Sequence, residues 1–232
     1  MEQEMVQKPY RGIGMEGLTA KWYASLTAKS MDDFKALARR LGDSLPAGAR
    51  VLEVAPGPGY FAIELAKLGS KGLGDYRIKG LDISRTFVDI AQKNASDARV
   101  DIDFRHGNAS AMPFASRSFD FVLCRAAFKN FSEPLRALQE MYRVLDTGGR
   151  AVIIDLRKDA SAESIDRAVN QMHVGSVNGL ITKFTFRHVL LKRAYTKRDF
   201  EQFVDQTAFS PVEIDQNDLG LELTLHRGRR QA

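Results

Sequence analysis

Short apolar runs alternate with apolar stripes of helical spacing along most of the chain. Residues 51–54 form an apolar run interrupted by one acid, as in a buried strand. The apolar residues of 61–68 recur at i, i+4 and i+7, as on one face of a helix, and Gly57 and Gly59 separate the two patterns. The same order, a strand and then a helix, recurs through residues 76–154. It predicts an α/β fold with a doubly wound, mostly parallel sheet.

The same periodicities and their end signals assign the other segments. The predicted elements are two helices between residues 15 and 41, strands at 76–82, 102–105, 119–124 and 151–154, and helices at 85–95, 134–145 and from the capping box Thr196–Asp199 onward. Apolar and polar residues alternate between positions 212 and 225 around a polar turn, which predicts an antiparallel hairpin at the sheet edge. We therefore expect a Rossmann-like sheet that ends in an antiparallel C-terminal hairpin.

The predicted elements fit one domain over residues 1–232 with two elaborations. Residues 1–48 are expected to form an N-terminal helical cap, whose first 14 residues lack periodicity and are expected to be a mobile arm. Residues 157–195 interrupt the strand–helix alternation and carry apolar patches at helical spacing, which predicts a helical lid.

The joint between the first strand and its helix has the composition of a ligand site. Its glycines let backbone N–H groups come close to a ligand, because a side chain at Gly57 or Gly59 would block the approach. Glu53 lies inside the apolar strand, where a buried acid needs a partner such as a ligand ammonium group or ribose hydroxyls. Asp82 ends the second strand, 23 residues past Gly59, where a ribose-binding carboxylate belongs in a nucleotide-binding βαβ unit. The glycine spacing alone also fits a dinucleotide fingerprint.

Composition narrows the function classes. The net charge is +5, with 34 basic against 29 acidic residues, but the basic clusters lack interleaved aromatics, which disfavours nucleic acid as a partner. No run approaches the roughly 18 apolar residues of a membrane span. The start of the chain does not resemble a signal peptide, and the single cysteine fits a reducing compartment, so we expect a cytoplasmic protein. No metal site is predicted.

Several stretches resemble the motifs of class I S-adenosylmethionine (SAM)-dependent methyltransferases. In motif I, Glu53 stands at the acid, Gly57 and Gly59 at the second and third glycines, and Ala55 replaces the first. Asp82 resembles the ribose acid of motif II. The later matches are Gly107–Ala109 with Met112–Phe114, Ser118–Val122 and Arg143–Gly149. The chain is most similar to small-molecule methyltransferases akin to those of ubiquinone and menaquinone biosynthesis.

The resemblance implies SAM as cofactor, S-adenosylhomocysteine as product and a small-molecule acceptor that is methylated by SN2 transfer. In the family, an acid faces the adenine amino group, and Asn108 stands in its place here. The side-chain carbonyl oxygen of Asn108 can still accept a hydrogen bond from that amino group. Arg125, just past the fourth strand, is placed to meet the methionine end of the cofactor. The expected cofactor-binding set is Glu53, Ala55, Pro56, Gly57, Gly59, Asp82, Ile83, Asn108, Ala109 and Arg125.

No strict catalytic constellation is expected or found, since SAM is already activated and alignment can supply most of the catalysis. His173, in the predicted lid, is the first candidate base, and Tyr195 could orient a substrate hydroxyl; a solvated histidine and a packing aromatic are the alternatives. Trp22 and Tyr23 could close over the site from the N-terminal cap or pack on the sheet. Weaker candidates for a functional role at the site are Lys129, Asp155 and His188.

Two other functions stay open, as does a homodimer. One is another SAM- or nicotinamide-using enzyme on the same scaffold. The other is a non-catalytic SAM-binding module, which turnover of SAM with an acceptor would separate from an enzyme.

Overall fold

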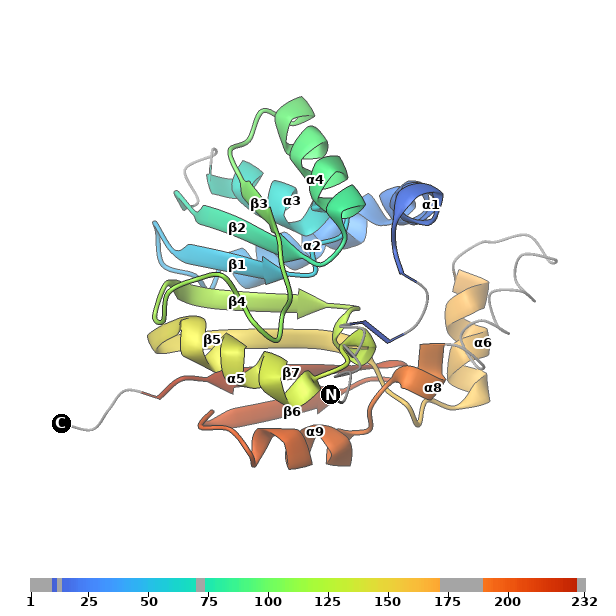
Figure 1. Cartoon of the computed structure of the whole chain (residues 1–232). Coiled ribbons are helices and arrows are strands. Elements are labelled where there is room, and N and C mark those ends of the chain that lie inside the picture. Colours follow the sequence, from blue (N-terminus) through green and yellow to red (C-terminus); the bar gives the residue numbers. More distant parts are fainter. Residues whose placement is uncertain (1–9, 12–13, 70–73, 172–189, 229–232) are drawn as a thin grey trace, which may run out of the picture.

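A computed structural model describes residues 10–11, 14–69, 74–171 and 190–228. Within these residues, seven strands form one sheet in the order β3-β2-β1-β4-β5-β7-β6 (Figure 1). The strands are β1 Arg50–Val54, β2 Arg77–Asp82, β3 Asp103–His106, β4 Phe119–Arg125, β5 Leu145–Leu156, β6 Val212–Gln216 and β7 Gly220–His226. Strands β1 to β5 pair in parallel, and β7 and β6 add to β5 as an antiparallel hairpin. The predicted fold class is confirmed.

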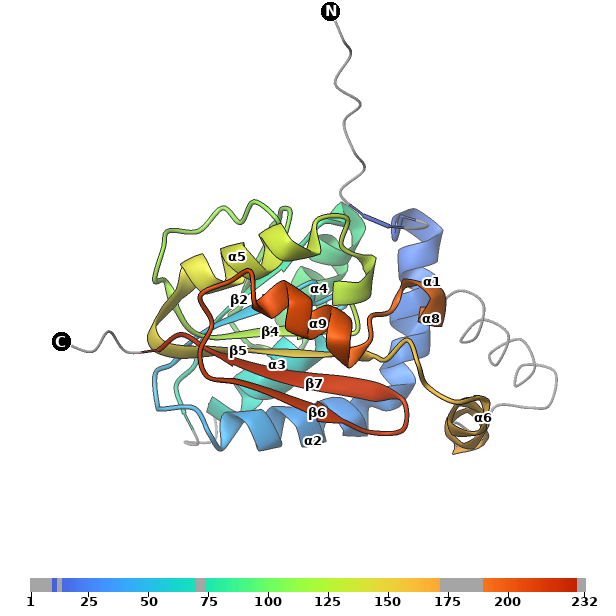
Figure 2. The ribbon, with the colours of Figure 1, turned by 90° about the horizontal axis from the view of Figure 1, so that it is seen from below.

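Helices cover both faces of the sheet (Figure 2). The helices are α1 Gly17–Thr27, α2 Met31–Gly42, α3 Tyr60–Leu68, α4 Arg85–Asp97, α5 Pro134–Val144, α6 Ala162–Gln171, α8 Leu191–Arg193 and α9 Lys197–Val204. Alternate residues of each strand point to opposite faces, so Leu52 packs in the core under α5 and α9, and Val51 packs in the core under α2, α3 and α4. This double coverage explains why the central strands are apolar almost throughout.

The first helix lies across the carboxyl edge of the sheet, which is the edge where β1, β2, β4 and β5 end (Figure 1). Ser84 Oγ, just past β2, donates to the Met15 carbonyl, and Gly17 N donates to Thr86 Oγ1 at 3.0 Å. The Tyr60 hydroxyl, at the start of α3, donates to the Ala24 carbonyl at 3.1 Å. These bonds hold α1 above the glycine joint. A 3-10 turn, Ala28–Ser30, then leads into α2, which agrees with the prediction of two helices between residues 15 and 41.

The boundary between α5 and β5 differs most from the prediction, since the strand expected at 151–154 spans Leu145–Leu156. Leu145 was expected to end the helix that carries Leu138 and Met141, but α5 ends at Val144 and Leu145 begins β5. Its extended backbone pairs with Phe119, and the register then shifts before Phe121. Leu145 is fully buried. The apolar pattern required a buried residue at this position, and Leu145 is buried as part of a strand and not of the helix.

The described part of the chain holds no helix long and apolar enough to cross a membrane. The segment predicted as a lid is described in part, and its helices α6 and α8 lie beyond the carboxyl edge (Figure 1). His173 and His188 lie outside the described residues.

Candidate functional site

The turn after β1 has a left-handed backbone at three positions. Ala55 has φ +56°, Gly57 has φ +55° and Gly59 has φ +78°. Ala55 stands where the motif has its first glycine, so the turn keeps the glycine-like geometry with a side chain that disfavours it by about 1 kcal/mol. The Ala55 N–H donates to the Leu81 carbonyl at 2.8 Å, which ties this turn to the end of β2.

Gly57 and Gly59 differ in what surrounds them. A side chain at Gly57 would meet no atom of the protein within 4 Å, so the space beside it is open. A side chain at Gly59 would come within 2.8 Å of the Phe104 ring and 3.0 Å of Ala91 Cβ. Packing between β3 and α4 therefore requires a glycine at position 59, and its predicted role in leaving room for a ligand stays a prediction.

Asp82 joins the two turns at the carboxyl edge. One carboxylate oxygen, Oδ2, accepts from Gly57 N at 3.0 Å, and Oδ1 accepts from Ser84 N at 2.9 Å. Burial raises the pKa of this carboxyl group to about 6, against the lowering effect of the backbone N–H groups. With the N–H of Ile83 also acting on it, the carboxylate still keeps acceptor capacity, so it can accept from a ligand hydroxyl.

Glu53 lies directly behind this turn and is buried. Its Oε2 accepts from Ala62 N in α3 at 3.2 Å. Burial raises the pKa of Glu53 to about 8, although the charge of Arg125 lowers it. Among the described residues no salt bridge involves Glu53, so the protonated form prevails at neutral pH. The ligand ammonium group or ribose hydroxyls that the sequence calls for as partners of Glu53 stay a prediction.

Two further predicted contacts are engaged within the protein. Asn108 Oδ1 accepts from Ser110 N at 2.9 Å, which closes the loop after β3 and leaves one lone pair on that oxygen. The Arg125 guanidinium lies 4.5 Å from the centre of the Phe34 ring on α2, as a cation–π contact. Arg125 nevertheless stays close enough to Glu53 to affect its pKa.

Tyr195 packs against other aromatic side chains, which is the alternative that the sequence analysis gave for it. Its ring makes edge-to-face contacts with Phe128, Phe200 and Phe203, with centroids 5.1 to 6.0 Å apart. Its hydroxyl accepts from Arg11 Nη1 at 2.7 Å, and burial raises its pKa. This aromatic cluster joins Tyr195 and α9 to the segment that follows β4, through Phe128.

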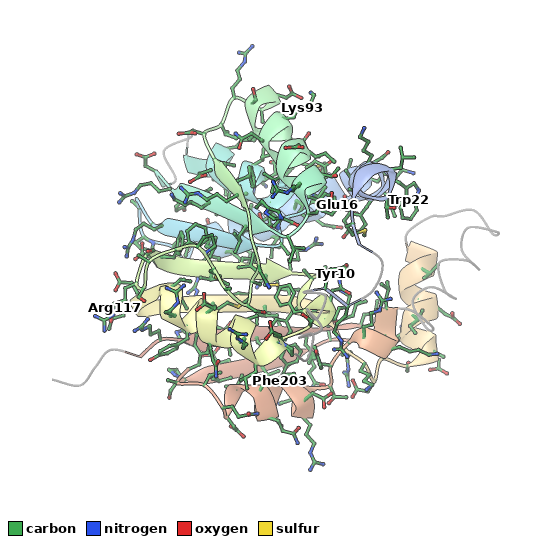
Figure 3. All side chains as sticks on the ribbon, in the orientation of Figure 1. Tyr10, Glu16, Trp22, Lys93, Arg117 and Phe203 are labelled. Carbon is green, nitrogen blue, oxygen red and sulfur yellow. The ribbon has the colours of Figure 1, made fainter. Side chains whose placement is uncertain are left out.

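The N-terminal segment brings residues to the edge that the sequence did not indicate. Tyr10 forms a backbone bridge with Phe131, and Arg11 N donates to the Asn130 carbonyl at 2.7 Å. The expectation of a mobile arm is wrong for these two residues. Tyr10 lies at the carboxyl edge (Figure 3). Burial raises its pKa, the charge of Arg193 lowers it, and the carboxylates of Asp82 and Asp155 raise it further. No periodicity or motif marks Tyr10, so sequence analysis had no signal for it.

Trp22 and Tyr23 lie on different sides of α1. Tyr23 points inward, where its ring meets that of Phe87 edge to face at 5.9 Å and burial raises its pKa. Trp22 is 65% exposed and projects away from the sheet (Figure 3). Neither predicted position of Trp22, over the site or packed on the sheet, is correct.

A buried ion pair ties the ends of β4 and β5 together. Lys129 Nζ lies 2.7 Å from Asp155 Oδ1, with side chains 5% and 1% exposed, and Lys129 N donates to Asp155 Oδ2 at 2.9 Å. Lys129 Nζ also donates to the Ala126 carbonyl at 2.6 Å. In the sequence, the pair is indicated by Asp155, an acid that directly follows the apolar run at 151–154. No cluster of three metal-ligating side chains occurs among the described residues.

Comparisons with known proteins agree with this geometry. Residues 52–153 match the family described as methyltransferase domain. The demethylmenaquinone methyltransferase of Deinococcus radiodurans is 34% identical over 141 residues, which are 61% of this chain and 51% of the relative. That of Lactococcus lactis is 32% identical over 158 residues, 67% of this chain and 60% of the relative. The chain thus spans little more than half the length of these relatives.

Solved structures share the fold at low sequence identity. A candidate SAM-dependent methyltransferase of Methanococcus maripaludis has a TM-score of 0.75 and 20% identity, covering 96% of this chain and 98% of that one. A SAM-dependent methyltransferase of Aquifex aeolicus has a TM-score of 0.64 and 15% identity, covering 90% and 96%. The [4+2]-cyclase SpnF has a TM-score of 0.55 and 19% identity, covering 84% and 80%. The fold therefore serves more than one reaction.

Proposed function

We propose that this chain, which carries a methyltransferase domain of the class I SAM-dependent fold, transfers the sulfonium methyl group of SAM to a small-molecule acceptor. The observation that carries the proposal is the joint at the carboxyl edge, where Asp82 holds the Gly57 N–H beside open space. Open α/β sheets bind ligands at this edge. The family match at residues 52–153 includes the joint.

The residues of the joint fit the chemistry of SAM. Asp82 would accept from the ribose hydroxyls, and the remaining lone pair of Asn108 Oδ1 would accept from the adenine amino group. Glu53 is a buried acid whose proton an incoming ammonium group can displace, which suits the methionine end. The backbone of Pro56, Ile83 and Ala109 would complete the site. When bound, the cofactor supplies a methyl group activated by the positive sulfur.

The contribution of the protein is then to position the acceptor and exclude water. Helix α1 covers the edge through bonds from Ser84, Gly17 and Tyr60. Tyr10 lies at this edge, and Tyr23 is on the inner side of the helix. Burial raises the pKa of both phenol groups, so they stay protonated and can donate to an acceptor oxygen. Catalysis by alignment in a water-poor site needs no further group.

We place the acceptor among small aromatic molecules of the quinone-precursor class. The support is the name of the relatives and the aromatic side chains at the edge, Tyr10, Tyr23 and Phe131. The transfer needs a base only if the nucleophile arrives protonated and is not acidic enough to ionise alone. His173 stays the candidate base from the sequence, and Tyr195 stays a candidate for orienting the acceptor. The buried free thiol of Cys124 is compatible with the cytoplasm.

The test is transfer of a labelled methyl group. The protein would be incubated with methyl-labelled SAM and a demethylated quinol, with S-adenosylhomocysteine measured alongside the labelled product. We expect label in the acceptor, and we expect Asp82→Ala to weaken SAM binding by about 1.5–3 kcal/mol through lost hydrogen bonds. SAM binding without transfer to any acceptor tried would favour a binding module or a non-methylating enzyme, and absence of SAM binding would overturn the proposal.

A further inference from the structure

Helix α1 has its small residues inside and its large apolar residues outside. The buried side chains of this helix are Ala20 and Ala24. Leu18, Trp22 and Leu26 are 84%, 65% and 45% exposed, and they are the large apolar side chains exposed in the part of the chain that the structure describes. A helix that only packs on its own domain shows the opposite arrangement.

The three residues form one stripe because they follow each other at four-residue spacing. Residues four apart on a helix lie on the same face, so Leu18, Trp22 and Leu26 make a continuous apolar line along the outer side of α1. Trp22, in the middle of this line, projects away from the sheet (Figure 3). An exposed apolar patch of this kind marks an interaction surface.

The charges beside the stripe are positive. Lys21 and Lys29 are exposed, and α1 with the turn that follows it contains no acid. Glu16 precedes the helix and is directed to α4, where it accepts from Arg85 N, Thr86 N and Thr86 Oγ1. At the start of α2, Asp32 pairs with Lys35 at 2.9 Å, and Asp33 is exposed.

We infer that the outer face of α1 docks on an anionic lipid bilayer. Leucine and tryptophan on one side of a helix, flanked by lysines, are the composition of helices that lie in the membrane interface. A second copy of the chain is a poorer occupant, because a face-to-face pair would bring the lysines of both copies together. Docking in this way would turn the carboxyl edge toward the membrane, and it stands independently of the proposed methyl transfer.

The single tryptophan of the chain makes the test direct. The full-length protein would be titrated with vesicles of phosphatidylcholine containing about a third phosphatidylglycerol, while Trp22 emission and the vesicle-bound fraction are measured. We expect emission to shift to shorter wavelength as Trp22 enters the interface. Binding should weaken on vesicles of phosphatidylcholine alone and at high salt, since the lysines contribute through screened charge.

Variants separate this face from the rest of the surface. Leu18→Gln with Leu26→Gln should lower vesicle affinity about tenfold or more and leave the fold intact, because both side chains are exposed. Lys21→Gln with Lys29→Gln should lower it roughly fivefold to thirtyfold. The matched control is Lys93→Gln with Lys197→Gln, which removes the same charge from exposed positions on α4 and α9 and should have a much smaller effect.

Four results would overturn the inference. They are an unchanged Trp22 emission in the presence of vesicles, wild-type binding by the Leu18 and Leu26 variant, equal loss of binding in the control, and a Trp22 that is already shielded from iodide in the free protein. Shielding that depends on protein concentration and disappears in the Leu18 and Leu26 variant would identify a second copy as the occupant instead.

Discussion

Glu53 couples the candidate site to the pH dependence of folding. Its pKa rises from an ordinary 4.5 to about 8 in the folded protein, so between these values the folded state binds more protons than the unfolded state. The free energy of unfolding therefore decreases as pH rises through this window. Asp82 acts in the same direction between an ordinary 3.8 and about 6.

Glu53→Gln should remove this penalty, because an amide cannot ionise. We expect the variant to be more stable than the wild type at pH 8 by roughly 1–4 kcal/mol and to differ little near pH 4.5. Urea denaturation of both proteins at the two pH values measures this. A difference of the same size at both values would show that the effect arises from packing and not from ionisation.

The residues of the glycine turn show how far a motif can be interpreted from sequence. Spacing and the acid at Glu53 were enough to place the joint between a strand and a helix. They could not show that Ala55 adopts the left-handed backbone of the missing glycine, or that Gly59 makes room for Phe104. Both facts depend on neighbours that are distant in the sequence.

At the scale of elements, the Lys129–Asp155 pair fixes the loop after β4 to the end of β5. Breaking one side of a buried pair leaves an unpaired charge, so Lys129→Met or Asp155→Leu alone should each lower the free energy of unfolding by about 3–5 kcal/mol. The double variant should recover most of that loss, since it buries no charge. Denaturation of the wild type, both single variants and the double variant gives the coupling energy. Additive losses would show that the pair does not act as a unit.

Most elements follow from periodicity, because a strand or helix with one buried face repeats that face at a fixed spacing. The capping box at Thr196–Asp199 is a case in which side-chain chemistry set the boundary as predicted. Leu145 is the opposite case, since a buried leucine satisfies the end of a helix and the start of a strand equally well. The direction of Trp22 is a further case, because an apolar residue on a helix was taken to face the protein.

For the whole molecule, the order of motifs along the chain was sufficient to predict the sheet and the family resemblance, and both are confirmed. The assignments of residues 157–195 as a lid, of one domain over the chain and of His173 as a base remain predictions. Tyr10 and Arg11 could not have been placed from sequence, because their position depends on contacts with residues distant in the sequence, the loop after β4 and the Tyr195 hydroxyl.

The central claim is that the turn at Gly57 receives SAM, and a pair of matched glycine variants tests it most directly. Gly57 and Gly48 both have a positive φ, +55° and +74°, and a side chain at either would meet no atom within 4 Å. Gly48 precedes β1, at the opposite end of that strand from the carboxyl edge. Alanine therefore imposes similar backbone strain at both positions but approaches the proposed ligand at only one.

Calorimetric titration of SAM into the wild type, Gly57→Ala and Gly48→Ala is the measurement. We predict that Gly48→Ala binds as the wild type does and that Gly57→Ala loses about tenfold or more in affinity, because its methyl group occupies space that the ligand needs. Equal affinity in all three proteins, or no binding of SAM by the wild type, would contradict the account.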